Sequence, residues 1–101
     1  MNDEEGFREG RLALFSVGQV VITQGAAARL GRAGVPAHKY LSAHQRGDWG
    51  CVSGNDAAQN DSSLREGGGM QSVYRLPDGQ KIWVITERDR SVTTLLLPEE
   101  Y

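Results

Sequence analysis

The carboxy-terminal third of the chain constrains the fold most, because it holds three short β-type segments separated by turn residues. QSVYRL (71–76) and KIWVITE (81–87) flank PDGQ (77–80), and SVTTLLL (91–97) follows RDR and stops before a proline. Proline presets the backbone for a turn, and the following glycine accepts a positive φ. The pattern therefore predicts a β-hairpin that continues into a third strand, forming an antiparallel meander.

The alternation of side chains assigns two faces to this meander. With a four-residue turn, Leu76 pairs with Lys81, and Tyr74 then lies opposite Trp83 on one face. In the same register, Ser72 and Thr93 both lie beside Ile85. Both faces contain aliphatic residues, so either helices cover one face and the amino-terminal segment or a partner covers the other, or the sheet is nearly buried. A second copy of the chain is one such partner. An exposed face holding Tyr74 and Trp83 would be an interaction surface.

The residues before the meander predict one further strand and two or three short helices. SVGQVVIT (16–23) is rich in β-branched residues, and AAARLGRAG (26–34) has the alanines of a helix and a capping glycine. A second helix follows Pro36 and directs His44 inward, and a third has Ser53 as its N-cap. We therefore predict an α+β fold: a small antiparallel sheet, made of the meander and the amino-terminal strand, packed with these helices. Residues 1–16 are expected to form a flexible tail and residues 17–101 a single domain.

Composition excludes several classes of protein. The chain has 101 residues, 39% of them hydrophobic, and its longest apolar runs, VVI and LLL, are too short to cross a membrane. No signal sequence is visible at the acidic amino terminus, so a cytoplasmic location is expected. Cys51 is the single cysteine, and its spacing from His38 and His44 does not suit a metal site, so we expect no metal and no cofactor. The net charge of -2 argues against broad capture of nucleic acid.

Several stretches together resemble a family of small, uncharacterised bacterial proteins that are often labelled plasmid-related. The stretches are HQRGDWG (44–50), Asn60, LREGG (64–68), SVYRL (72–76) and KIWVITERDRSVTTLLLPEEY (81–101). The resemblance covers roughly residues 17–101, and the chain departs from the family pattern at Cys51 and Val52. It implies carriage on mobile elements, and it brings no established activity.

Two sets of side chains are candidates for function. Histidine titrates near neutral pH, so His44 is a candidate base that Asp48 orients, and Arg88 and Arg90 are candidates for gripping a phosphate. The full catalytic set is His44, Asp48, Arg88, Arg90, Ser91 and Thr93. Each member also has a structural interpretation: an inward-facing histidine, a turn cap, ordinary turn residues and an ordinary strand threonine.

The candidate binding set consists of aromatic and cationic side chains that stack on or pair with a partner. Its members are Trp49, Tyr74, Trp83, Arg88 and Arg90. Core packing is the competing interpretation for the aromatic residues. We expect a non-catalytic accessory protein of mobile elements that binds a host or element-encoded macromolecule, with protein favoured over RNA; an anti-CRISPR-like inhibitor of a host defence complex is one concrete form. The alternative is a small metal-independent ribonuclease of the barnase or RelE-like type.

Overall fold

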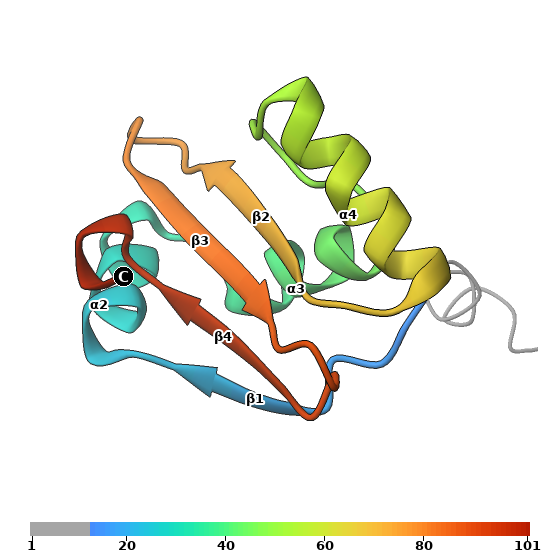
Figure 1. Cartoon of the computed structure of the whole chain (residues 1–101). Coiled ribbons are helices and arrows are strands. Elements are labelled where there is room, and N and C mark those ends of the chain that lie inside the picture. Colours follow the sequence, from blue (N-terminus) through green and yellow to red (C-terminus); the bar gives the residue numbers. More distant parts are fainter. Residues whose placement is uncertain (1–12) are drawn as a thin grey trace, which may run out of the picture.

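The computed structural model describes residues 13–101, which form three α-helices and a four-stranded sheet (Figure 1). In chain order the elements are β1 (Gln19–Ile22), α2 (Gln24–Ala33), α3 (Ala37–Gln45), α4 (Gly54–Glu66), β2 (Met70–Arg75), β3 (Lys81–Thr86), β4 (Val92–Leu96) and the 3-10 helix η1 (Pro98–Glu100). The predicted α+β class is confirmed. The strands lie in the order β1-β4-β3-β2, and β1 runs parallel to β4. The sheet is therefore mixed, whereas the sequence predicted a wholly antiparallel one.

The hairpin between β2 and β3 has a different register from the one that the sequence suggested. Arg75 pairs with Lys81, and Tyr74 pairs with Ile82 instead of Trp83. The other expected pairs were also wrong: Ser72 pairs with Val84, Thr93 with Thr86, and Ile85 with Gln71 and Thr94.

The cause of this difference is the loop between the two strands. The Leu76 amide donates to the Gln80 carbonyl at 2.7 Å, and the Gly79 amide donates to the Leu76 carbonyl at 2.8 Å. Gly79 has a φ of 89°, so the three-residue loop Pro77–Gly79 closes through a G1 bulge. A slip of one residue exchanges the faces of a strand. Tyr74 and Trp83 therefore lie on opposite faces of the sheet.

Helices α2 and α3 cover one face of the sheet, which we call the core face. Leu30 of α2 and Tyr40 of α3 pack there against Ile82, Val84 and Leu95, whose side chains are completely buried. Each such aliphatic side chain contributes about 1.5–3 kcal/mol when it is fully buried. Helix α2 begins at Thr23, whose hydroxyl accepts from the Ala26 amide, and ends at Gly34 in the left-handed conformation, as predicted.

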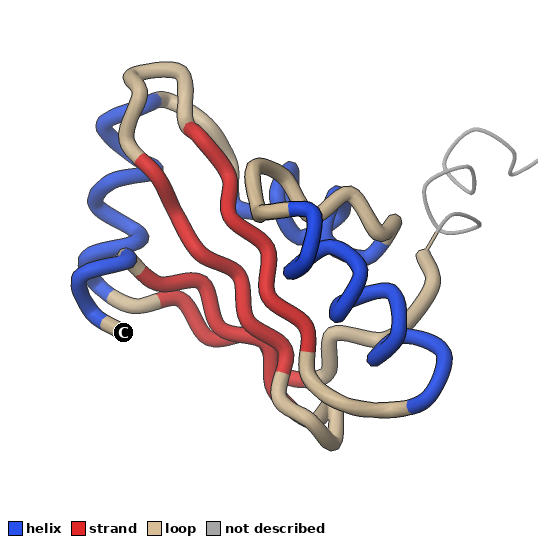
Figure 2. Tube along the Cα trace, turned by 45° about the horizontal axis from the view of Figure 1, so that its top comes forward, coloured by secondary structure: helices blue, strands red, loops and turns tan. Residues whose placement is uncertain are grey.

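Helix α4 lies beside the outer edge of β2 (Figures 1 and 2). As expected, it begins at Ser53, whose hydroxyl accepts from the Asp56 amide. A second apolar cluster, made of Phe15, Trp49 and Met70, includes residues from the loops on this side. The expected tail lies outside the described residues over 1–12, whereas Phe15 is buried in this cluster. The division into a tail and one domain stays a prediction.

Candidate functional site

His44, the predicted base, is at the centre of a buried hydrogen-bond network. Its Nδ1 lies 2.6 Å from the Ser72 hydroxyl of β2, and its Nε2 lies 2.8 Å from the Thr86 hydroxyl of β3. The Thr86 hydroxyl lies 2.7 Å from that of Thr93 on β4, which donates to the Val17 carbonyl at 2.8 Å. The side chains of all four residues are at most 1% exposed. The network therefore ties α3 and the segment before β1 to three strands.

The order of donors in this network fixes the tautomer of His44. A hydroxyl has one proton to donate, and Thr93 uses its proton on the Val17 carbonyl. Thr86 must then donate to Thr93, so His44 Nε2 carries the proton that Thr86 accepts. Ser72 is left to donate to Nδ1. With the ring neutral, every hydroxyl proton of the network is used once.

Burial reinforces the neutral state of His44. Removal of the ring from water lowers the pKa of His44 from 6.5 to about 4. Phe15 and Trp49 enclose the ring in edge-on contacts, with centroid distances of 5.3 and 5.6 Å. His44 thus faces inward, in agreement with the structural interpretation of the sequence. Its hydrogen-bond partners are side-chain hydroxyls.

The other predicted catalytic residues take separate structural positions. Asp48 accepts from the Gly50 amide through its carboxylate, at 3.2 Å, and from the Tyr74 hydroxyl through its backbone carbonyl, at 2.6 Å. Ser91 donates to the Asp89 carboxylate at 2.7 Å. Within the predicted catalytic set, only His44 and Thr93 belong to one hydrogen-bond network.

Arg90 holds the end of α4. Its guanidinium donates to the Ser63 carbonyl at 2.8 Å and to the Leu64 carbonyl at 3.3 Å, and it lies 5.8 Å from the centroid of the Phe15 ring. A cation in this position complements the partial negative charge at a helix carboxyl end. Arg90 adopts a φ of 62°, which places it in the left-handed region. Its contacts are those of a structural residue in the β3–β4 turn.

The predicted binding residues divide between the interior and the surface. Trp49 is buried and donates to the Asp61 carboxylate at 3.0 Å, and Tyr74 is buried on the core face. Trp83 lies on the opposite face, partly exposed, with its ring centroid 5.1 Å from that of Tyr101. Tyr101 is 78% exposed. Among the predicted binding aromatics, Trp83 alone is available to a partner.

The face that carries Trp83 is the candidate site, and we call it the open face. Among the described residues no α-helix lies over it, and Figure 2 shows its strands uncovered between the helices; η1 contacts β3 at one end, where Tyr101 packs against Trp83. Its members follow from the strand pairings: Arg75 beside Lys81 at the hairpin end, then Val73, Trp83 and Leu96, then Gln71, Ile85 and Thr94, and last Val92; of these, Leu96 is buried. The sequence could have identified Val73 and Ile85 through the period-two pattern, had the register been right.

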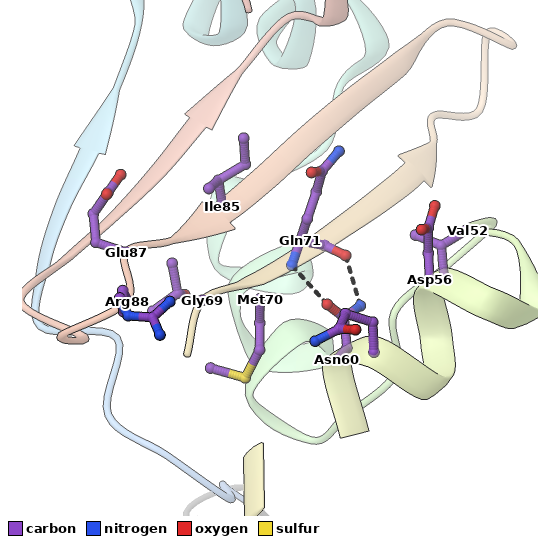
Figure 3. A pocket seen from close by; sticks show the side chains of 11 residues that line it. Val52, Asp56, Asn60, Gly69, Met70, Gln71, Ile85, Glu87 and Arg88 are labelled. Carbon is purple, nitrogen blue, oxygen red and sulfur yellow. Dashed lines mark hydrogen bonds between the residues drawn. The ribbon is translucent and has the colours of Figure 1, made fainter. Parts of the chain in front are cut away.

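A cavity of about 350 Å³ lies at one edge of the open face, between α4, β2 and the end of β3 (Figure 3). Its apolar lining comes from Val52, Met70 and Ile85, and its polar lining includes Asp56, Gln59 and Arg88. The size is at the lower end of the range of small-ligand sites. Among the described residues, Arg88 is exposed and has no hydrogen-bond or ion-pair partner. Arg88 thus supplies a free cation at the rim of the cavity.

The distribution of metal-ligating side chains and of apolar helices bears on two other classes of protein, metalloproteins and membrane proteins. Over residues 13–101, no three His, Cys, Asp or Glu side chains lie close enough together to hold a metal ion. None of the helices in this range combines the length and the apolar character that crossing a membrane requires.

Compared with known proteins, the chain matches no family model, no curated protein and no solved structure.

Proposed function

We propose that this chain is a non-catalytic binding protein whose partner, another protein, docks on the open face. The carrying observation is the partly exposed patch of Val73, Trp83 and Ile85, which has a cavity at its α4 edge. Aromatic side chains at the centre of an apolar patch dominate the energy of protein interfaces. A side chain of the partner that enters the cavity would fix its position on the sheet.

The charges around the open face indicate the chemistry of this partner. Arg75 and Lys81 lie directly opposite each other, and neither has an ion pair among the described residues. Like charges in directly opposed positions repel, and acidic groups of a partner would relieve this repulsion. Arg88 adds a third cation at the cavity, whose lining also includes the carboxylates of Asp56 and Glu87. We infer a partner surface with apolar residues at its centre and carboxylates facing Arg75 and Lys81.

The resemblance to plasmid-related proteins supports a role on mobile elements in the bacterial cytoplasm. An accessory protein of this kind has a host or element-encoded macromolecule as its target. Inhibition of a host defence complex, in the manner of an anti-CRISPR protein, is the concrete form that we propose. The net charge of -2 favours a protein partner over RNA, because broad capture of RNA needs a strongly basic face.

The position of His44 favours a binding role over the ribonuclease alternative. A general base must reach the proton that it removes, and the His44 ring is fully buried with both nitrogens occupied by hydroxyl groups. Arg90, the predicted phosphate ligand, is engaged by the carbonyl groups of α4. Neither residue is free for chemistry on a substrate.

The proposal is tested by plasmid establishment in cells that carry one defined defence system at a time. Wild-type protein should raise establishment against at least one system, and Trp83→Ala and Lys81→Glu should each abolish the effect. Arg32→Glu, which makes the same charge change on α2, is the matched control and should retain it. Thermal unfolding verifies that all variants fold. Full protection by Trp83→Ala and Lys81→Glu would contradict the proposal.

The ribonuclease alternative has its own assay. Purified protein is incubated with RNA in EDTA, and no cleavage above a buffer control is expected. Arg88→Ala is the useful variant, because Arg88 is exposed and its removal leaves the packing intact. Cleavage by the wild type that this variant abolishes would refute the non-catalytic role.

A further inference from the structure

The two outer strands of the sheet differ in how their free edges are covered. At the β2 edge, the Asn60 side chain accepts from the Gln71 amide at 3.0 Å and donates to the Gln71 carbonyl at 2.8 Å. The Val73 amide donates to the Trp49 carbonyl at 3.1 Å, and the Val73 carbonyl accepts from the Cys51 amide at 2.7 Å. The outward backbone groups of both strand residues are thus paired, and no further strand can join the sheet at β2.

The edge of β1 has no comparable cover among the described residues. Val20, Val21 and Ile22 are 39, 40 and 41% exposed, a run of three β-branched side chains on an outer strand. Free edges are normally protected by lysine, proline or a bulge, because an open edge pairs with other strands. Residues 17–28 contain no charged residue and no proline.

Among residues 13–101, the backbone of β1 presents unpaired groups in a regular pattern. The amides of Gln19 and Thr23 donate to carbonyls of the β4 side, Ser91 at 2.9 Å and Leu95 at 3.1 Å. Strand residues alternate in the direction of their backbone groups, so the N–H and C=O groups of Val20 and Ile22 point away from β4. These are the groups that an added strand would bind.

We propose that two copies of the chain pair through β1, antiparallel and around a twofold axis at Val21, into one sheet of eight strands, four from each copy. The β2 edge is sealed, so head-to-tail addition of copies is blocked and the β1 edge of one copy has only the β1 edge of another to meet. A closed, isologous dimer follows. The inference is independent of the proposed partner on the open face.

The pairing satisfies the outward groups of both strands. With Val21 opposite itself, Val20 of each copy exchanges two backbone hydrogen bonds with Ile22 of the other. The neutral edge brings no like charges together, although each copy has a net charge of -2. Because β1 has four residues, the contact falls below the roughly 1,000 Å² of a stable interface, and a reversible, concentration-dependent dimer is expected.

Sedimentation of the full chain over a wide range of concentrations tests the dimer. The average mass should rise from 11.0 kDa toward twice that value and no further. Val21→Lys places two cations at the axis and should weaken association at least tenfold, whereas the matched variant Val21→Thr should retain it. Circular dichroism and thermal unfolding verify that the Val21→Lys monomer is folded. A wild type that stays monomeric, a series of larger species, or equal association of Val21→Lys would overturn the proposal.

Cross-linking tests the register separately. In a Cys51→Ser background, Val21→Cys should form a disulfide-linked dimer on mild oxidation, because the two Val21 positions face each other in a pair without mutual hydrogen bonds. Gln19→Cys lies on the same face of the same strand but not at the axis, and it should cross-link far more slowly. Equal cross-linking of the two variants would refute the axis at Val21.

Discussion

The burial of His44 predicts a specific dependence of stability on pH. The folded protein holds the pKa of this imidazole at about 4, whereas the unfolded chain has the ordinary value of 6.5. Between these values the unfolded state binds a proton that the folded state excludes, so the free energy of unfolding falls as the pH falls. The contribution is complete above pH 6.5 and is lost progressively toward pH 4.

The size of the effect follows from the two pKa values. Lowering the pH from 7 to 5 protonates nearly all unfolded chains at this position but few folded ones. Linkage converts this difference into a loss of about 2 kcal/mol. For a domain of this size, that is a substantial part of a total stability of roughly 5–15 kcal/mol.

Urea unfolding of the wild type and of His44→Gln, each at pH 7 and pH 5, isolates this term. The glutamine variant cannot titrate at this position, so its loss of stability should be smaller than that of the wild type by about 2 kcal/mol, while carboxylate contributions cancel. His38→Gln changes an exposed histidine and should lose as much as the wild type. Equal losses in all three proteins would refute the argument from burial.

Three pairs of variants test other contacts by equilibrium unfolding. Asn60→Ala leaves the Gln71 amide and carbonyl unpaired and should lower the free energy of unfolding by about 2–3 kcal/mol. Asn60→Asp can still accept from the amide, so its loss should be smaller; equal losses for the two variants would contradict this. Arg90→Gly should be more stable than Arg90→Ala by about 1 kcal/mol, because glycine adopts the left-handed φ of 62° without the steric strain of a Cβ. The reverse order of stability would exclude backbone strain at this position. Gly50→Ala should lower the free energy of unfolding by more than about 2 kcal/mol, because its Cβ would overlap a β2 carbonyl. Gly31 has open space around it, so Gly31→Ala should stabilise α2 by about 1 kcal/mol. Similar effects of the two substitutions would argue against the overlap.

The elements of this fold follow from local sequence signals, and their pairing does not. The capping residues Thr23, Gly34 and Ser53 act where helix rules place them. The parallel contact of β1 with β4 joins segments far apart in the chain, and no local pattern specifies such a partner. The hairpin register depended on how many residues the loop holds, and the proline-aspartate-glycine sequence suits a three-residue loop as well as a four-residue turn.

The candidate site was predictable in part for the same reason. Trp83 was a candidate binding aromatic with core packing as the competing interpretation, and the slip of one residue placed Tyr74 beside it, whereas Tyr74 belongs to the core face. The network around His44 could not be derived, because Ser72, Thr86 and Thr93 look like ordinary strand residues until three strands align them. The inward direction of His44, by contrast, followed from its spacing on α3.

The parallel pairing of β1 with β4 has a consequence for how the chain folds during synthesis. Val20 and Ile22 leave the ribosome long before their β4 neighbours Thr93 and Leu95. Contacts between such distant segments form slowly because a long loop must close first. Strand β1 therefore stays apolar and without its neighbour until residues 92–95 have been made, and a chain released before residue 92 leaves it exposed to aggregation.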